Sequence, residues 1–468
     1  MASYNPGKLH ASSYSAYVHA GPTAYYDAAY VSLGTRSSLE KLYSMLEKLF
    51  VFLLLLSSMN VITALSPSSK EQTDLRVFSA NMDTSSVFID AAIYMYGVAL
   101  MLMRWRQVLR AARTAWPLLA LAGLAFLSTA WSVEPMLTLR RSVLLLASTM
   151  IAIYVGERYS IKAFAHLLAQ TFCWMIVLVL LVYLVAPEYV IDHSAYGGAW
   201  RGLSTYKNTF GEHMAVAVLL LALVRFRRFP WLRYVFLLLA AGLLFLSHSA
   251  TAVVCGVLTL AAVPLWRLMR GRQRLLVGVL VALTFFLGIY WLLAFPETIF
   301  QVLGRDATLT GRTDLWSKLL PVIGNRPVLG YGYAAFWTGS NAEVLNVWIG
   351  AGRLVPIADN GYIDLCLSLG AAGLALFLGV FTGAFRKAMA YLRSEHGFIG
   401  LWPITYLCIF AADNICESAL LTRGTFPFLV FAIVTTSLAL SHKRAMAAAR
   451  TANPQPIMWE LNRPVISR

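Results

Sequence analysis

Long apolar stretches recur along almost the whole chain and limit what it can fold into. Twelve stretches approach the length that a helix needs to cross the hydrocarbon core of a bilayer, about 20 residues. Backbone amides cannot stay unpaired in hydrocarbon, so such stretches form helices. The predicted spans are 49–65, 86–103, 115–131, 142–156, 163–186, 209–224, 234–248, 251–266, 275–294, 361–383, 398–415 and 424–440. The pattern predicts an all-α polytopic membrane protein.

The composition excludes the soluble classes of protein. Apolar residues make up 59% of the 468 residues and charged residues 13%, with a mean hydropathy of +0.66. Soluble proteins carry about 25% charged residues, and a soluble globule of this size needs more polar surface. The five cysteines form neither a CxxC pair nor a Cys/His metal spacing. A soluble enzyme, a disordered protein and a disulfide scaffold are therefore excluded.

Basic residues indicate the orientation of the predicted spans. The chain has 38 Lys+Arg against 22 Asp+Glu, a net charge of +16. Arginine clusters at 104–113, 225–233 and 267–274 lie in connections that the positive-inside rule assigns to the cytoplasm. Both termini are then cytoplasmic. Membrane orientation and contact with lipids explain the excess of Lys and Arg, so a nucleic-acid partner is not needed to explain it. The predicted organisation is a disordered cytoplasmic tail at 1–42, nine spans within 43–294, an external loop at 295–360, three spans within 361–440 and a cytoplasmic tail at 441–468.

The external loop at 295–360 is far longer than the other connections, and long loops in compact folds are usually functional. Thr313 is a predicted N-cap of a short amphipathic helix whose apolar face includes Leu315 and Leu319. Trp316 on this helix suits the membrane interface. Arg312 at the helix N-terminus suits an anionic ligand, although the segment alone favours contact with the phosphate of a lipid head group.

A second polar segment, 187–212, precedes a predicted span. Arg201, Lys207 and Asn208 lie near its end. Two cations close to a membrane face suit a pyrophosphate, and they suit simple contact with lipid head groups as well. The sequence leaves both interpretations open.

The end of the long loop carries carboxyl and amide groups. Asp359 and Asn360 end the loop, and Asp364 follows about one turn into the next span. A carboxylate near the membrane is costly unless it has a partner or a task, and pairing with a loop arginine is the structural alternative. Tyr331, in an aromatic and glycine-rich stretch of the loop, would form part of a stacking platform for a sugar, or of an aromatic belt.

Four motifs occur in a fixed order between about residues 120 and 380. They are LSTAWSVEPMLTLRR at 127–141, RGLSTYKNTFGEH at 201–213, GRDATLTGRTDLW followed by RPVLGYGYAAFW within 304–337, and DNGYIDLCLSLGAAGL at 359–374. Together they resemble the O-antigen ligase/O-antigen polymerase superfamily, and most closely its exopolysaccharide-polymerase-like branch.

The resemblance implies a membrane glycosyltransferase of GT-C-like architecture in the bacterial inner membrane. Such a protein moves an oligosaccharide from undecaprenyl pyrophosphate to an acceptor hydroxyl at the periplasmic face, without a metal or other cofactor. The acceptor is another lipid-linked unit in a polymerase and the lipid A core in a ligase.

The resemblance also assigns roles to residues. Arg201 and Arg312 match arginines that hold the donor pyrophosphate. Asp359 stands where many members have a histidine, the proposed general base. Asp is less basic than His, with reference pKa values of about 3.9 and 6.5, so His193 or His248 is an alternative base. The further predicted substrate contacts are Lys207, Asn208, Arg305, Tyr331 and Asn360.

Two other functions compete with glycosyl transfer. A transporter or flippase of lipid-linked oligosaccharides tends to show internal repeats and charges at the membrane midplane. Here the polar residues concentrate in outer loops, which favours chemistry at the membrane surface. A non-catalytic role beside other polysaccharide assembly proteins is the third interpretation, and the arginine and aspartate pattern argues against it.

Overall fold

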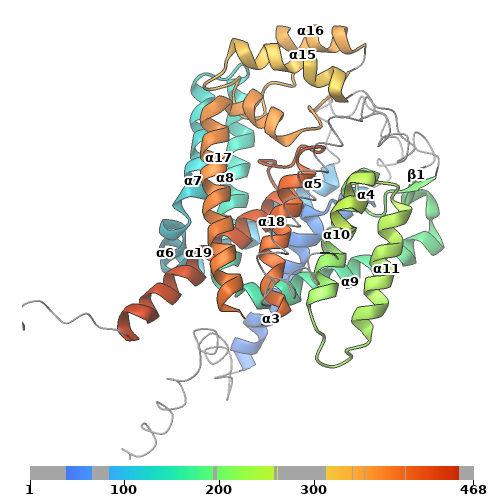
Figure 1. Ribbon diagram of the computed structural model, residues 1–468, viewed down its shortest axis with the longest axis vertical. Coiled ribbons are helices and arrows are strands. Elements are labelled where there is room, and N and C mark those ends of the chain that lie inside the picture. The colour runs from blue at the N-terminus through green and yellow to red at the C-terminus, as the bar shows by residue number, and fades with distance from the viewer. Residues whose placement is uncertain are drawn as a thin grey trace, which may run out of the picture.

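The computed structural model describes most of the chain, and the described part is mostly helical (Figure 1). The described residues are 38–65, 84–192, 198–257, 261, 312–339, 341–352, 354–395 and 397–452. Within them the strands are β1 (Ile191–Asp192) and β2 (Ala199–Trp200), a short antiparallel pair in which Ile191 faces Trp200. Arg305 and His193 lie outside the described residues.

Four described helices are long and apolar enough to cross a membrane: α8 (Pro135–Arg158), α9 (Ile161–Val185), α17 (Gly361–Ser394) and α19 (Phe426–Ala452). A fifth is gained if α5 (Thr84–Met103) and α6 (Trp105–Thr114), bent by 96°, count as one span. The described part of the chain is thus mostly helical and has the span candidates of a multi-pass membrane protein.

Further helices cover other predicted spans of the described residues. They are α3 (Ser38–Ser58), α4 (Val61–Ala64), α7 (Trp116–Leu127) with η3 (Ser128–Ala130), α10 (Lys207–Leu223), α11 (Leu232–Leu246), and η5 (Phe398–Leu401) with α18 (Trp402–Asp413). The predicted span 275–294 and half of 251–266 lie outside the described residues.

Several helices extend past the apolar stretches that predicted them. α8 begins at Pro135 instead of residue 142, because a proline in the first turn starts a helix regardless of the arginines that follow. α17 continues to Ser394 and α19 to Ala452, since polar residues can prolong a helix beyond the hydrocarbon. Hydropathy marks where a chain is apolar, so it underestimates such helices.

The helix α10 forms the centre of one half of the bundle. Every residue from Phe210 to Leu221 on this helix is buried, and Figure 1 shows it beside α9 and α11. In the other half α19 packs along α8, and α17 packs against α7 and α19. An aromatic cluster joins α17, α18 and α19. The ring centroid of Phe431 lies 4.8 Å from that of Phe410 and 5.9 Å from that of Phe377.

A small second core covers one end of the bundle. It is built on α15 (Arg312–Asn325) and α16 (Ala342–Ala351), which lie together across the top of the molecule in Figure 1. Leu315 and Leu319 are buried in it, as their helical spacing predicts. Thr313 lies within α15, whose first described residue is Arg312, so its predicted place as N-cap is wrong.

The covering loop docks into a break in α17. Gly370 leaves the helical conformation with φ +62°, and the chain at 327–332 takes up the freed backbone groups. Tyr331 N donates to Leu367 O at 2.7 Å, and Ala371 N donates to Pro327 O at 2.8 Å. A span of this kind needs such partners, because hydrocarbon offers none. The predicted span 361–383 gave no indication of this break.

Replacing Gly370 with alanine is expected to destabilise the protein by about 2 kcal/mol or more. A Cβ at this position would lie 2.3 Å from the backbone of Val328, and the positive φ disfavours any side chain. Gly379 on the same helix is the matched control, since a Cβ there meets no atom within 4 Å. Thermal unfolding in detergent measures both variants, and equal melting temperatures would contradict this account of the break.

Connections that are predicted on the outer side meet at the α15 end of the bundle. Trp131, after α7, donates its indole N–H to Leu329 O at 3.0 Å. Tyr333 donates its hydroxyl to Leu421 O, after α18, at 2.7 Å. Asn208, at the start of α10, reaches Glu417 in that same connection. This end therefore gathers the polar segments that the sequence analysis singled out.

Candidate active site

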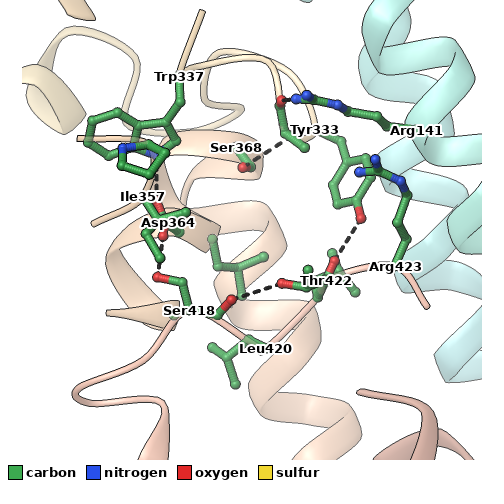
Figure 2. A pocket seen from close by; sticks show the side chains of 15 residues that line it. Arg141, Tyr333, Trp337, Ile357, Asp364, Ser368, Ser418, Leu420, Thr422 and Arg423 are labelled. Carbon is green, nitrogen blue, oxygen red and sulfur yellow. Dashed lines mark hydrogen bonds between the residues drawn. The ribbon is translucent and has the colours of Figure 1, made fainter. Parts of the chain in front are cut away.

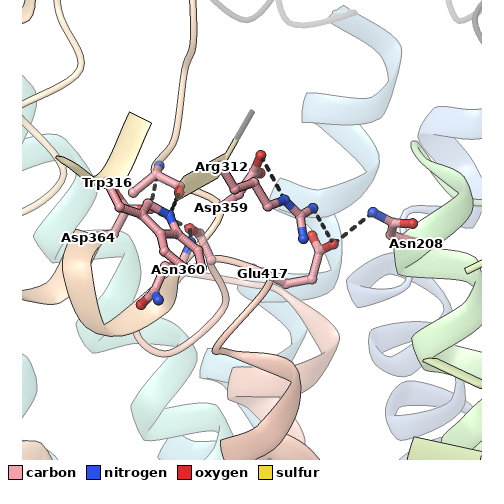
Figure 3. A network of polar contacts seen from close by, with 9 residues as sticks. Asn208, Arg312, Trp316, Asp359, Asn360, Asp364 and Glu417 are labelled. Atoms are coloured by element: carbon pink, nitrogen blue, oxygen red, sulfur yellow. Dashed lines mark hydrogen bonds and ion pairs between the residues drawn. The ribbon is translucent and has the colours of Figure 1, made fainter. Parts of the chain in front are cut away.

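Four chain segments contribute to a polar network beneath α15. Arg312 comes from the start of α15, Asp359 from the loop before α17, Glu417 from the loop after α18 and Asn208 from the first turn of α10 (Figure 3). The network therefore depends on the packing of the α15 end of the bundle, and no single motif builds it.

Arg312 lies at the centre of this network. Its Nε is 3.4 Å from Asp359 Oδ2, and its Nη2 is 3.4 Å from Glu417 Oε1. The same oxygen of Glu417 accepts from Asn208 Nδ2 at 2.8 Å. Burial alone would lower the pKa of Arg312, but the two carboxylates outweigh it and raise that pKa. The guanidinium is thus a permanent cation held between two acids.

Glu417 is the acid whose charge changes near neutral pH. Burial raises the pKa of this carboxyl to about 7, although Arg312 and the hydrogen bond from Asn208 both lower it. At physiological pH the group therefore exchanges between a carboxylate, which offsets the charge of Arg312, and a neutral acid, which does not.

The backbone on both sides of Asp359 is fixed. Asp359 has φ +49°, a left-handed conformation that few residues other than glycine, Asn and Asp adopt. On one side Ala358 O accepts from the indole N–H of Trp316 at 2.8 Å. On the other, Asn360 N donates to Ser418 Oγ at 3.1 Å. These contacts hold the Asp359 side chain, 28% exposed, against Arg312.

Asn360 and Trp316 have structural tasks that the sequence analysis did not assign. Asn360 is the N-cap of α17, and its Oδ1 accepts from Tyr362 N and Ile363 N at 3.0 and 3.1 Å. Its predicted contact with substrate stays a prediction. Trp316, expected at the membrane interface, ties α15 to the loop through its N–H. Both residues position Asp359.

Asp364 has partners other than the predicted loop arginine. It accepts from Trp337 Nε1 at 2.7 Å, from Ala358 N at 3.0 Å and from the hydroxyl of Ser418. The carboxylate therefore joins the loop before α17 to the loop after α18, directly behind Asp359.

Arg201 lies apart from this network. Its guanidinium donates to Tyr189 O at 3.2 Å and to Glu188 O at 3.5 Å. Burial lowers its pKa, an effect that Asp192 counteracts. Among the residues that the structure describes, it makes no contact with Arg312. Lys207, predicted to end the outer loop, is the first residue of α10.

The other predicted residues divide between the protein interior and its surface. Tyr331 is only 2% exposed and donates its hydroxyl to Val322 O at 2.9 Å, so its ring packs inside the α15–α16 core and offers no stacking platform. The alternative base His248 is exposed at the end of α11. Groups of three or more His, Cys, Asp or Glu side chains that would hold a metal are absent from the described ranges.

Comparison with known proteins adds to this geometry. Residues 234–378 match the family model described as O-antigen ligase. This part of the chain is therefore similar to O-antigen ligases. Over 321 residues the chain is 26% identical to the exopolysaccharide production protein ExoQ of Rhizobium meliloti (strain 1021). This alignment covers 65% of this chain and 72% of ExoQ. These matches indicate the activity of a bacterial membrane glycosyltransferase, of the ligase or polymerase type.

The match to the O-antigen ligase family covers only part of the network. It includes Arg312 and Asp359 but neither Asn208 nor Glu417. The sequence analysis also missed Glu417, although one signal was present. Glu417 closely follows the predicted span 398–415, and the argument that a carboxylate near the membrane needs a partner applies to it as it does to Asp364.

Proposed function

We propose that this chain polymerises exopolysaccharide. It transfers an oligosaccharide from undecaprenyl pyrophosphate to the hydroxyl of a second lipid-linked unit, at the periplasmic face of the inner membrane. The observation that carries this proposal is the contact of Arg312 with Asp359, because a diphosphate-binding cation and a base must be adjacent in such a reaction. The similarity to an exopolysaccharide production protein favours the polymerase over the ligase.

In the proposed reaction the acceptor oxygen attacks the anomeric carbon of the donor sugar. The bond from that carbon to the diphosphate oxygen breaks, and undecaprenyl diphosphate leaves. The acceptor proton passes to Asp359, while Arg312 stabilises the charge that develops on the leaving oxygen. Diphosphate is a good leaving group, so no acid is needed to protonate it. Arg201 is the second cation proposed for the donor, since its carbonyl partners leave its charge in place.

Donor binding would also activate the base. In the structure Asp359 contacts Arg312 at 3.4 Å, so the guanidinium offsets part of the negative charge of this carboxylate. A bound diphosphate competes for the same guanidinium. Asp359 then loses part of its counter-charge and becomes a better proton acceptor. The site therefore gains its base strength only when the donor is present.

The orientation and the span count belong to this proposal as well. The arginine clusters support cytoplasmic termini and a periplasmic α15–α16 core. Twelve spans with a GT-C-like architecture are proposed from the apolar pattern. The substrates proposed are lipid-linked, and membrane lipids and other polysaccharide assembly proteins are the proposed partners.

Reconstitution tests the proposed function directly. Purified protein in vesicles that contain a single lipid-linked repeat unit is expected to form a ladder of longer saccharides, with no lipid A core present. Transfer that occurs only after lipid A core is added would indicate a ligase and would contradict the polymerase function. Absence of transfer to either acceptor would refute the proposed function.

Glu417→Gln is expected to remove a pH dependence of donor binding. With its pKa near 7, Glu417 is mostly neutral at pH 6 and mostly charged at pH 8. The charged form repels the diphosphate and offsets Arg312. The Kd of the wild type for the lipid-linked donor should therefore rise about fivefold to tenfold from pH 6 to pH 8. In the variant it should stay constant.

The control for this change is Glu343→Gln. Glu343 accepts a hydrogen bond from Asn325 on α15, which a glutamine preserves, and it lies outside the network. Equilibrium binding in nanodiscs between pH 6 and pH 8 gives the three Kd profiles. A wild-type profile that falls with pH, or a slope that persists in Glu417→Gln, would contradict the role given to Glu417.

A further inference from the structure

A cavity of about 240 Å³ lies on the far side of the loop that carries Asp359. It is enclosed by the first half of α8, the segment around Tyr333, the start of α17 and the loop before α19 (Figure 2). Figure 2 shows Arg141 and Arg423 along one wall and Trp337 and Asp364 along the opposite wall. The proposed transfer reaction has so far used none of these four side chains as a substrate contact.

The two arginines bring two positive charges to one wall of the cavity. The guanidinium of Arg141 donates to Ala334 O, a neutral acceptor. Arg423 is close enough for the two charges to interact. Within the described part of the chain neither guanidinium forms an ion pair. Two neighbouring cations at a partly buried cavity repel each other, and an anion between them removes this cost.

The opposite wall suits a saccharide. Trp337 donates its indole N–H to Asp364, so the ring is fixed in orientation at the edge of the cavity. Asp364 uses its oxygens for three hydrogen bonds and keeps acceptor capacity for a sugar hydroxyl. A cavity of this size holds a small group such as one sugar ring, since drug-sized ligands occupy about 300–1,000 Å³.

The cavity and the transfer site share their walls. Asp364 lines the cavity and accepts from Ala358 N, next to Asp359 in the chain. Ser418 also lines the cavity and follows Glu417. A saccharide in the cavity would therefore lie against one side of the loop that carries Asp359. The donor diphosphate would bind Arg312 on the other side of that loop.

We propose that this cavity binds an oxyanion of the acceptor saccharide between Arg141 and Arg423, and so places the acceptor hydroxyl beside Asp359. This inference rests on the proposed transfer function. Guanidinium groups bind both carboxylate and phosphate, so the oxyanion belongs either to an acidic sugar or to the diphosphate that links the acceptor to its lipid.

Matched probes separate these two sources. Octyl β-glucuronide and octyl β-glucoside differ by one carboxylate, and octyl diphosphate supplies a diphosphate without a sugar. Their Kd values are measured in nanodiscs on the full-length chain. The variants are Arg423→Gln and Arg141→Gln, with exposed Arg140→Gln, the neighbour of Arg141, as the control for lost charge. Arg312→Gln removes binding at the donor site.

The wild type is expected to bind octyl β-glucuronide at least tenfold more tightly than octyl β-glucoside. Arg423→Gln should abolish this preference, and Arg140→Gln and Arg312→Gln should retain it. If, in the Arg312→Gln background, Arg423→Gln weakens the binding of octyl diphosphate alone, the site still binds an oxyanion. In that case the oxyanion comes from the lipid linkage. If neither anionic probe depends on Arg423, the proposal is overturned.

Arg423→Gln is the variant that tests the acceptor site. Arg141 also supports the fold, because it donates to Ala334 O. A kinetic arm separates this inference from the proposed function. In reconstituted vesicles Arg423→Gln should raise the KM for the acceptor at least tenfold and leave the Kd for the donor unchanged. Transfer with a normal acceptor KM in this variant would refute the acceptor site alone. Tight binding of an anionic probe without any transfer would refute the transfer function alone.

Discussion

Arg312→Ala is expected to lower glycan transfer by at least about a hundredfold, the loss typical of removing one group that stabilises developing negative charge. In the structure this guanidinium is the cation that contacts both Asp359 and Glu417. Without it the leaving diphosphate loses its partner. Arg312→Lys should also be poor, because a single ammonium cannot reproduce the two-pronged contact of a guanidinium. Saccharide ladders from reconstituted vesicles measure the rate.

Loss of Arg312 also removes the cation that contacts both Asp359 and Glu417, which threatens the fold as well as the reaction. The double variant Arg312→Gln/Glu417→Gln removes one positive and one negative charge, so the local charge balance is kept. It should recover the melting temperature and stay inactive. Lys318→Ala, on the same helix and paired with Asp314 outside the network, is the matched control. Normal ladders in the double variant would remove Arg312 from the mechanism.

The sequence predicted the features that depend on local pattern. The long apolar stretches indicated a multi-pass helical protein, and the spacing of Leu315 and Leu319 indicated α15. Arg312 and Asp359 were singled out from separate motifs, and the structure places them 3.4 Å apart. Each of these features can be seen in a short stretch of sequence or in a family motif.

What the sequence did not predict depends on contacts between distant segments. Tyr331 was expected on a surface, but hydropathy cannot show that the external loop has a core of its own. Asn360 caps α17 only because the chain turns there. Glu417 joins Arg312 only when the loop after α18 folds under α15. Such contacts follow from tertiary packing, which a single sequence does not encode in any local pattern.

Asp359→Asn is expected to lower kcat by about a hundredfold or more, the contribution of a general base. Asparagine has the same shape and tolerates the left-handed conformation at φ +49°, so the loop should keep its structure. Asparagine cannot accept the acceptor proton. It also leaves Arg312 with one counter-charge fewer, so the KM for the donor should stay constant or fall. Initial rates at varied donor concentration separate kcat from KM.

Asp359→His then distinguishes a base from a residue that only orients Arg312. Histidine is a stronger base than aspartate, with a reference pKa of about 6.5, and its neutral form accepts a proton. Activity should return and should rise as the pH increases through this range, a profile that the Asn variant lacks. If Asp359 merely held the guanidinium, a histidine beside Arg312 would give no rescue and no new pH dependence. A kcat for Asp359→Asn within threefold of the wild type would exclude the base role, because asparagine keeps the shape of aspartate and removes only its ability to accept a proton.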